Sequence, residues 1–245
     1  EGGLIAIVGP QGLRAWLRAV LTNSYARLGR MKVRVHEIVG LRAIERGPSK
    51  MRPPVETGRP LPNEVPGLSI EPGEDGTWSI PLGDGEPPVD VTAVELDHTV
   101  PTLGWVLHEN PRPGKLDGGG YEPGRRKLAI LSDMRGPKTA AAAVPHLSDA
   151  TVVVHESTSA FLRVDAHRKR PAEVERLAHA HGHSTPQVAG RLATKVRARH
   201  LVLTHFSTRY GGDASSFSRG QMAEIRALAA REYGGAITTA LDLMR

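Results

Sequence analysis

The sequence predicts an α/β fold, and three patterns in its 245 residues support that prediction. Short apolar runs rich in β-branched residues recur along the chain, as expected for buried strands. Amphipathic stretches with helical spacing lie between several of these runs. Four of the predicted strands end at a histidine or an acidic residue, so polar groups collect where strands enter loops. A chain of this length can also bury a substantial core.

The first residues predict a strand, a helix and a second strand. Residues 4–8 are an apolar run that ends at a Gly-Pro turn, and residues 11–27 carry apolar side chains on one helical face. Residues 32–38 alternate valines with basic residues, which is typical of a strand.

Residues 47–88 contain many prolines and glycines and show little periodicity. We interpret them as an insertion within a single domain that spans residues 1–245, because segments of this composition form long surface loops. Trp78-Ser79-Ile80 is a candidate short strand inside the insertion.

The four strands that end in functional residues follow this insertion. They cover residues 91–96, 127–131, 151–154 and 201–204, and they end at Asp97-His98, Ser132-Asp133, His155-Glu156 and His205. Strand ends on one edge of a sheet are neighbours in space, so we expect these side chains to lie close together. Further helices are predicted at residues 138–143, 186–197 and 219–233, and a last strand at residues 237–243.

Three of these residues form a candidate metal site. His98, Asp133 and His205 together offer two imidazoles and one carboxylate, which is a ligand set suited to zinc. The alternative is that each residue is a separate polar cap where a strand enters a loop. The chain has no cysteine, which excludes a thiolate zinc site and a disulfide framework.

Several segments, in a single order along the chain, resemble ribonuclease Z, the tRNA 3′-processing endonuclease family of the metallo-β-lactamase superfamily. The matching segments are Gly9-Pro10-Gln11-Gly12-Leu13, His98 to Trp105, Ser132-Asp133-Met134-Arg135, His155-Glu156-Ser157-Thr158, His183-Ser184-Thr185 and Leu203 to Tyr210. The resemblance covers most of the chain and implies a metallo-β-lactamase-like αββα sandwich. Met134 replaces the threonine that the family carries beside its bridging aspartate.

One family segment has no counterpart in these residues. The family's main zinc motif, His-x-His-x-Asp-His, does not occur, and the chain opens at Glu1-Gly2-Gly3. We expect an N-terminally incomplete fold that holds only the second half of a two-metal site. The alternative is a natural subunit that never contained the motif.

The resemblance also implies roles for individual residues. It implies two zinc ions in the complete site, with His98 on one ion, His205 on the other and Asp133 bridging both. It further implies that His183 donates a proton to the leaving oxygen and that Glu156 orients the His183 ring. From the residues alone, the sequence favours an ordinary loop histidine at position 183, beside His179 and His181.

Charge points to a polyanionic partner. Lys and Arg number 32 against 26 Asp and Glu, a net charge of +6, and the resemblance implies precursor tRNA as substrate and a homodimer. Two basic stretches are candidates for phosphate contact, and they contain Arg125, Arg126, Arg168, Lys169 and Arg170. Each stretch is equally consistent with a solvated loop or helix face. No apolar run approaches the length of a membrane span.

The function that these observations favour is a zinc-dependent endoribonuclease that removes the 3′ trailer from precursor tRNA. One alternative is another metallo-β-lactamase-fold phosphodiesterase that acts on small esters. A second alternative is a non-catalytic RNA-binding homologue that lacks the first metal motif.

Overall fold

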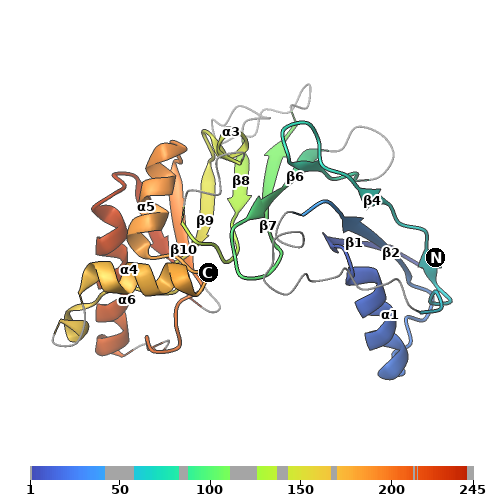
Figure 1. The fold of residues 1–245 in the computed structure, drawn as a ribbon, viewed down its shortest axis with the longest axis horizontal. Coiled ribbons are helices and arrows are strands. Elements are labelled where there is room, and N and C mark those ends of the chain that lie inside the picture. Colours follow the sequence, from blue (N-terminus) through green and yellow to red (C-terminus); the bar gives the residue numbers. More distant parts are fainter. Residues whose placement is uncertain are drawn as a thin grey trace. The chain divides into compact units, whose positions relative to one another are not determined.

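The computed structural model describes residues 2–41, 58–82, 88–110, 126–136, 143–166, 170–211, 213 and 215–241. They belong to two compact units, Glu1–Ser79 and Ile80–Arg245, whose elements are drawn in Figure 1. The single-domain organisation over residues 1–245 stays a prediction. Arg125, Arg168, Lys169 and most of the predicted helix at residues 138–143 lie outside the described residues.

The first unit is built on a β-α-β arrangement. Strand β1 (Leu4–Pro10) pairs in parallel with β2 (Lys32–Ile38), and helix α1 (Leu13–Asn23) connects them. The short strands β3 (Glu64–Val65) and β4 (Ser69–Ile70) also pair with β2, and β5 (Trp78–Ser79) lies at the end of the unit. The predicted elements at residues 4–8, 11–27 and 32–38 are therefore confirmed, with small shifts at their ends.

Helix α1 differs from the expectation in its environment. Its predicted apolar face is not buried, since Trp16 is 61% exposed and none of the helix residues is buried among the described residues. Its N-terminus is held by the carboxylate of Glu37, which accepts hydrogen bonds from the main-chain N–H groups of Gly12 and Arg14 at 2.8 and 3.0 Å. A carboxylate at this position satisfies free N–H groups of the first turn and complements the helix dipole.

The second unit contains one mixed sheet, with its strands in the order β11-β10-β9-β8-β7-β6. The strands are β6 (Val89–Leu96), β7 (Thr102–Glu109), β8 (Lys127–Ile130), β9 (Val152–Glu156), β10 (His200–Thr204) and β11 (Ala236–Thr239). Strand β7 is antiparallel to both of its neighbours, and the strands from β8 to β11 are parallel. Strands β6 and β8 consequently run in the same direction.

The sequence did not identify β7, and Gly104 in its centre explains why. Glycine is depleted in strands, so the segment lacks the usual pattern. In the structure, a Cβ at Gly104 would lie 3.0 Å from a methyl group of Leu131 and 3.1 Å from one of Val94. A side chain at this position would therefore be in tight contact with both neighbours.

Helices of the second unit fill the connections between its parallel strands. They are α3 (Val144–Leu147), the 3₁₀ turn η1 (Arg163–Asp165), α4 (Pro171–Ala180), α5 (Pro186–Lys195) and α6 (Ser216–Ala230). Helix α5 packs on α6, β9 and β10, and its buried residues Ala189, Leu192 and Ala193 join the hydrophobic core. The predicted helices at residues 186–197 and 219–233 are confirmed, and α4 was not predicted as a separate helix. None of the described helices is long and apolar enough to cross a membrane.

Candidate metal and catalytic site

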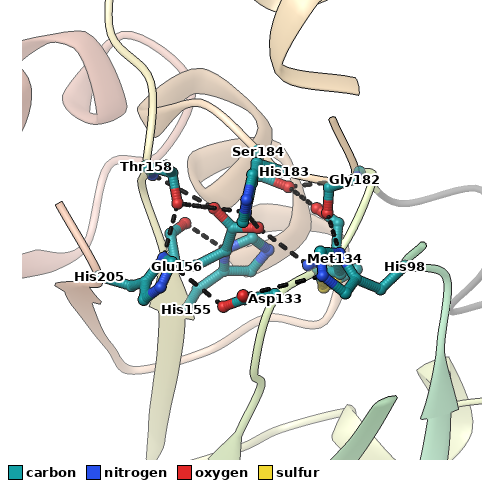
Figure 2. Close-up of polar contacts among 11 residues, drawn as sticks. His98, Asp133, Met134, His155, Glu156, Thr158, Gly182, His183, Ser184 and His205 are labelled. Atoms are coloured by element: carbon teal, nitrogen blue, oxygen red, sulfur yellow. Dashed lines mark hydrogen bonds and ion pairs between the residues drawn. The ribbon is translucent and has the colours of Figure 1, made fainter. Parts of the chain in front are cut away.

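The topology brings the predicted functional residues to one edge of the second sheet. Strands β6, β8, β9 and β10 run in the same direction, so their C-terminal ends share an edge. His98, Asp133, Glu156 and His205 follow or end these four strands, and Figure 2 shows them converging with His183. The sequence therefore predicted correctly which side chains gather at this edge.

Asp133 lies between two of the imidazoles (Figure 2). Its Oδ2 is 3.9 Å from Nε2 of His98, and its Oδ1 is 3.5 Å from Nδ1 of His205. Ligand atoms of one tetrahedral zinc ion are about 3.4 Å apart, given bonds of about 2.0–2.1 Å. Each oxygen thus faces a different histidine, which is the arrangement that a bridging carboxylate requires.

The ring of His98 is fixed by the main chain. Its Nδ1 is 2.7 Å from the carbonyl oxygen of Gly182, and its side chain is 11% exposed. Because a carbonyl oxygen only accepts, Nδ1 carries the proton and donates it. The free lone pair is then on Nε2, which is the nitrogen that faces Asp133. Histidines that bind metals commonly have their second ring nitrogen held in this way.

His183 lies between the other two imidazoles and contacts a buried carboxylate. Its ring centroid is 5.2 Å from that of His98 and 5.5 Å from that of His205. Its Nδ1 is 3.3 Å from Oε1 of Glu156, whose side chain is 1% exposed. A carboxylate in this position orients the imidazole ring.

Hydrogen bonds compensate the burial of Glu156. Its Oε1 accepts from the main-chain N–H of Met134 at 2.8 Å, and its Oε2 accepts from the N–H and the hydroxyl of Thr158 at 3.2 and 2.6 Å. Burying a carboxylate is costly unless such donors replace water. The donor from Met134 belongs to the main chain, so it survives the loss of the family's threonine hydroxyl at this position.

Thr158 is a functional candidate that sequence reasoning missed. Its hydroxyl donates to Glu156, and the same oxygen lies 2.7 Å from Nδ1 of His205 and 3.4 Å from Nδ1 of His183. A hydroxyl has one proton to donate, so it accepts from His205. The available signal was the position of Thr158 within the segment that resembles the family, two residues after Glu156.

The loop that carries Thr158 is held by the segment after β10. The Tyr210 hydroxyl, which is buried, accepts from the main-chain N–H of Ala160 at 2.6 Å, and Arg209 donates to that hydroxyl and to the Ala160 carbonyl. The Tyr210 hydroxyl also donates to the Ala160 carbonyl at 3.1 Å, which requires the neutral phenol, and burial raises the pKa of that phenol. The two segments thereby fix each other beside the site.

The described residues offer two overlapping ligand sets. Asp133, His183 and His205 each present one ligand atom within 4.8 Å of the others. The second set is the pair His98 and Asp133, in which Nε2 of His98 lies 3.9 Å from Oδ2 of Asp133. The imidazole and carboxylate groups of either set are suitable zinc ligands. The His98 ring is also oriented as in a metal-binding histidine, with Nδ1 held by the main chain and Nε2 free. The assignment of His183 as proton donor and not ligand stays a prediction.

The predicted RNA-binding residues are only partly described. Arg126, at the end of the first basic stretch, forms an ion pair with Glu109 through two hydrogen bonds, at 2.7 and 2.5 Å. A phosphate at Arg126 would have to compete with that carboxylate. Arg170 is exposed directly before α4.

Comparison with known proteins gives related sequences and a related fold. The zinc phosphodiesterase ELAC protein 1 of Homo sapiens is 30% identical over 252 aligned positions, which cover 84% of this chain and 63% of the relative. The solved structure of human tRNase Z, short form, superposes with a TM-score of 0.61 at 26% identity, over 98% of this chain and 66% of that one. The chain has a metallo-β-lactamase fold and is similar to ribonuclease Z.

Two further comparisons agree with this result. Ribonuclease Z of Pseudomonas putida (strain GB-1) is 32% identical over 192 residues, which cover 64% of this chain and 56% of the relative. The metallo-β-lactamase fold protein YhfI from Bacillus subtilis shares the fold, with a TM-score of 0.51 at 15% identity, over 91% of this chain and 68% of that one. No protein-family model matches the chain. The chain spans 56% of the length of the bacterial ribonuclease Z and 63% of the length of the human phosphodiesterase.

Proposed function

We propose that this chain forms part of a zinc-dependent endoribonuclease that removes the 3′ trailer from precursor tRNA by phosphodiester hydrolysis. The observation that carries the proposal is Asp133 between two imidazoles, beside a third imidazole held by a buried carboxylate. The similarity to proteins named ribonuclease Z and tRNase Z supports the choice of substrate.

The proposed metal ligands are His98, Asp133 and His205. Bound zinc would supply an activated water, since it lowers the pKa of that water towards about 7, and would neutralise charge on the phosphate. The chain's own contribution is to orient these ligands. The carbonyl of Gly182 holds the ring of His98, and the two oxygens of Asp133 face His98 and His205. Two zinc ions in the complete site remain part of the proposal.

The proposed proton donor is His183. A leaving alkoxide needs a proton, and a positioned histidine side chain can supply it as a general acid. Glu156 holds Nδ1 of His183, which leaves Nε2 as the nitrogen that delivers the proton. The side chain of His183 is 23% exposed, so a substrate can reach it.

The experiment that tests the proposal uses the protein expressed from its complete reading frame, with zinc. We expect cleavage of a precursor tRNA at the boundary of its 3′ trailer, and loss of this cleavage in Asp133→Asn. The matched control is Asp149→Asn, which removes an exposed carboxylate paired with Arg197. Asp149 precedes the N-terminal end of β9, whereas Glu156 is at the C-terminal end of that strand. Cleavage of a small phosphodiester but not of precursor tRNA would favour the small-ester hydrolase. RNA binding without zinc binding or cleavage would favour the non-catalytic homologue.

A further inference from the structure

Gly182 contacts a candidate metal ligand from a distant part of the chain. Its carbonyl oxygen is 2.7 Å from Nδ1 of His98, although the two residues are 84 positions apart. Gly182 immediately precedes His183, so one short segment touches the first candidate ligand and carries the candidate acid. Figure 2 shows this segment beside the His98 ring.

The position of Gly182 admits no side chain. Its φ of +84° lies in the left-handed region, where other residues are strained. A Cβ at Gly182 would also lie 2.4 Å from Nδ1 and 2.8 Å from Cε1 of His98. These are atoms of a ring that is itself packed in place, so a side chain would displace the imidazole from Asp133.

The end of helix α4 holds the Gly182 segment in place. The N–H of Gly182 donates to the carbonyl of His179 at 3.0 Å, and the N–H of His183 donates to the carbonyl of Ala178 at 2.8 Å. These bonds satisfy carbonyl groups that are otherwise free at a helix C-terminus. The Gly182 carbonyl therefore projects from the anchored end of a helix and not from a free loop.

We infer that Gly182 is a positioning residue: its carbonyl fixes the tautomer and orientation of His98, and it couples the metal-binding ring to the segment that carries His183. The inference rests on the proposed function for the metal-binding role of His98. The tautomer itself follows from the hydrogen bond alone. Only glycine suits this position, since the left-handed backbone conformation disfavours a side chain and the His98 ring occupies the space that a Cβ would need.

The first test measures the tautomer of His98 directly in this chain, without substitution, by nitrogen-15 and proton NMR of its imidazoles at about pH 8, where an ordinary histidine is neutral. We expect a proton on Nδ1 and none on Nε2. A proton on Nε2 would overturn the inference, whatever the function of the protein. This measurement needs no variant and therefore does not depend on how a substitution affects folding.

The second test uses the protein expressed from its complete reading frame. It compares zinc affinity, by chelator competition, in the wild type, Gly182→Ala and Gly76→Ala. Gly76 has a φ of +74°, but an added Cβ there would meet no heavy atom within 4 Å, so this control carries the backbone strain without the clash. Loss of a group that orients a ligand typically weakens metal binding by about 10- to 100-fold. We expect this loss in Gly182→Ala alone, and equal zinc affinity in all three proteins would overturn the inference.

A third variant separates this inference from the proposed function. If His98→Ala binds zinc as tightly as the wild type, His98 is not a ligand and the proposed metal site is wrong. The Nδ1 tautomer would still stand as a structural finding in that case. If His98→Ala loses zinc but Gly182→Ala does not, the proposed site survives and the role of Gly182 is refuted.

Discussion

The hydroxyl of Thr158 and Nδ1 of His205 are 2.7 Å apart, and the same Nδ1 lies 3.5 Å from Oδ1 of Asp133. One ring nitrogen therefore faces two partners. It can donate to Thr158 or bind an ion beside Asp133, but it cannot do both, because a nitrogen that carries a proton has no free lone pair.

Thr158→Val should destabilise the protein without weakening zinc binding. The variant removes a donor to the buried Glu156, a change that typically costs about 1–3 kcal/mol of unfolding free energy. It also releases Nδ1 of His205 for a metal. Urea denaturation and chelator competition measure both effects, and Thr158→Ser is the control because it keeps the hydroxyl. Weaker zinc binding in the valine variant alone would show that Thr158 orients His205 for the metal.

In the protein expressed from its complete reading frame, His183→Ala should lower the cleavage rate while leaving the zinc content unchanged, because a proton donor is not a ligand. General acid–base groups contribute about 100- to 10,000-fold to rate. The measurements are single-turnover cleavage of precursor tRNA and zinc content by mass spectrometry. Loss of zinc would instead assign His183 to the ligand set that it forms with Asp133 and His205.

This chain alone should bind zinc weakly. His98, Asp133 and His205 supply three ligand groups, which are too few to close two sites, since structural zinc usually takes four ligands. Isothermal titration calorimetry with zinc should therefore show weak binding that Asp133→Asn abolishes. Two tightly bound ions per chain would show that the site is complete within these residues.

Charge reversal of Arg168, Lys169 and Arg170 to glutamate should weaken binding of precursor tRNA more than hydrolysis of a small phosphodiester. Only the long substrate reaches beyond the metal site, and removing cationic side chains that bind phosphates makes tRNA binding less dependent on salt. Filter binding at several salt concentrations measures the affinity and its salt dependence. The companion variant Arg126→Glu tests the other basic stretch, where Glu109 already pairs with the arginine. An equal loss on both substrates would mean that these residues support the fold or the site.

Acid should destabilise the first unit through His36. Burial lowers the pKa of His36, with further lowering by the charges of Arg34 and Arg14, and its Nδ1 accepts a hydrogen bond from Leu68 N–H at 3.2 Å. The unfolded chain, with a histidine pKa of about 6.5, takes up a proton before the folded chain does. The free energy of unfolding is therefore unaffected by His36 above that pH and falls as the pH drops below it.

The variant His36→Asn checks this dependence. Its amide oxygen can accept from the Leu68 N–H group without titrating, so the free energy of unfolding should fall less steeply with acid than in the wild type. Burial also lowers the pKa of His155, which contributes in the same direction in both proteins. Urea denaturation between about pH 8 and pH 5 gives the difference, and identical slopes would contradict the role of His36.

The sequence by itself determined the strands of the site and the residues at their ends. Runs such as Leu201 to Thr204 are recognisable because a buried strand needs consecutive apolar, β-branched side chains, and a polar residue marks its exit. His98, Asp133, Glu156 and His205 could therefore be assigned to one sheet edge before their distances were known. Strand β7 was not predicted, since Gly104 interrupts its pattern, and the tight contacts that a Cβ there would make with Leu131 and Val94 cannot be recognised from strand propensity.

Only the tertiary structure decided which atoms meet. The Gly182 carbonyl reaches His98 across 84 residues, and the Thr158 hydroxyl reaches His205 across 47. Such contacts depend on where loops from different strands and helices end in space, and no local pattern encodes that. A glycine and a threonine in loops also serve many ordinary turns, so their residue types alone carry little information. The roles of Gly182 and Thr158 are recognised only from the structure, which shows the ring nitrogens that they contact. It also shows that both rings face the carboxylate of Asp133.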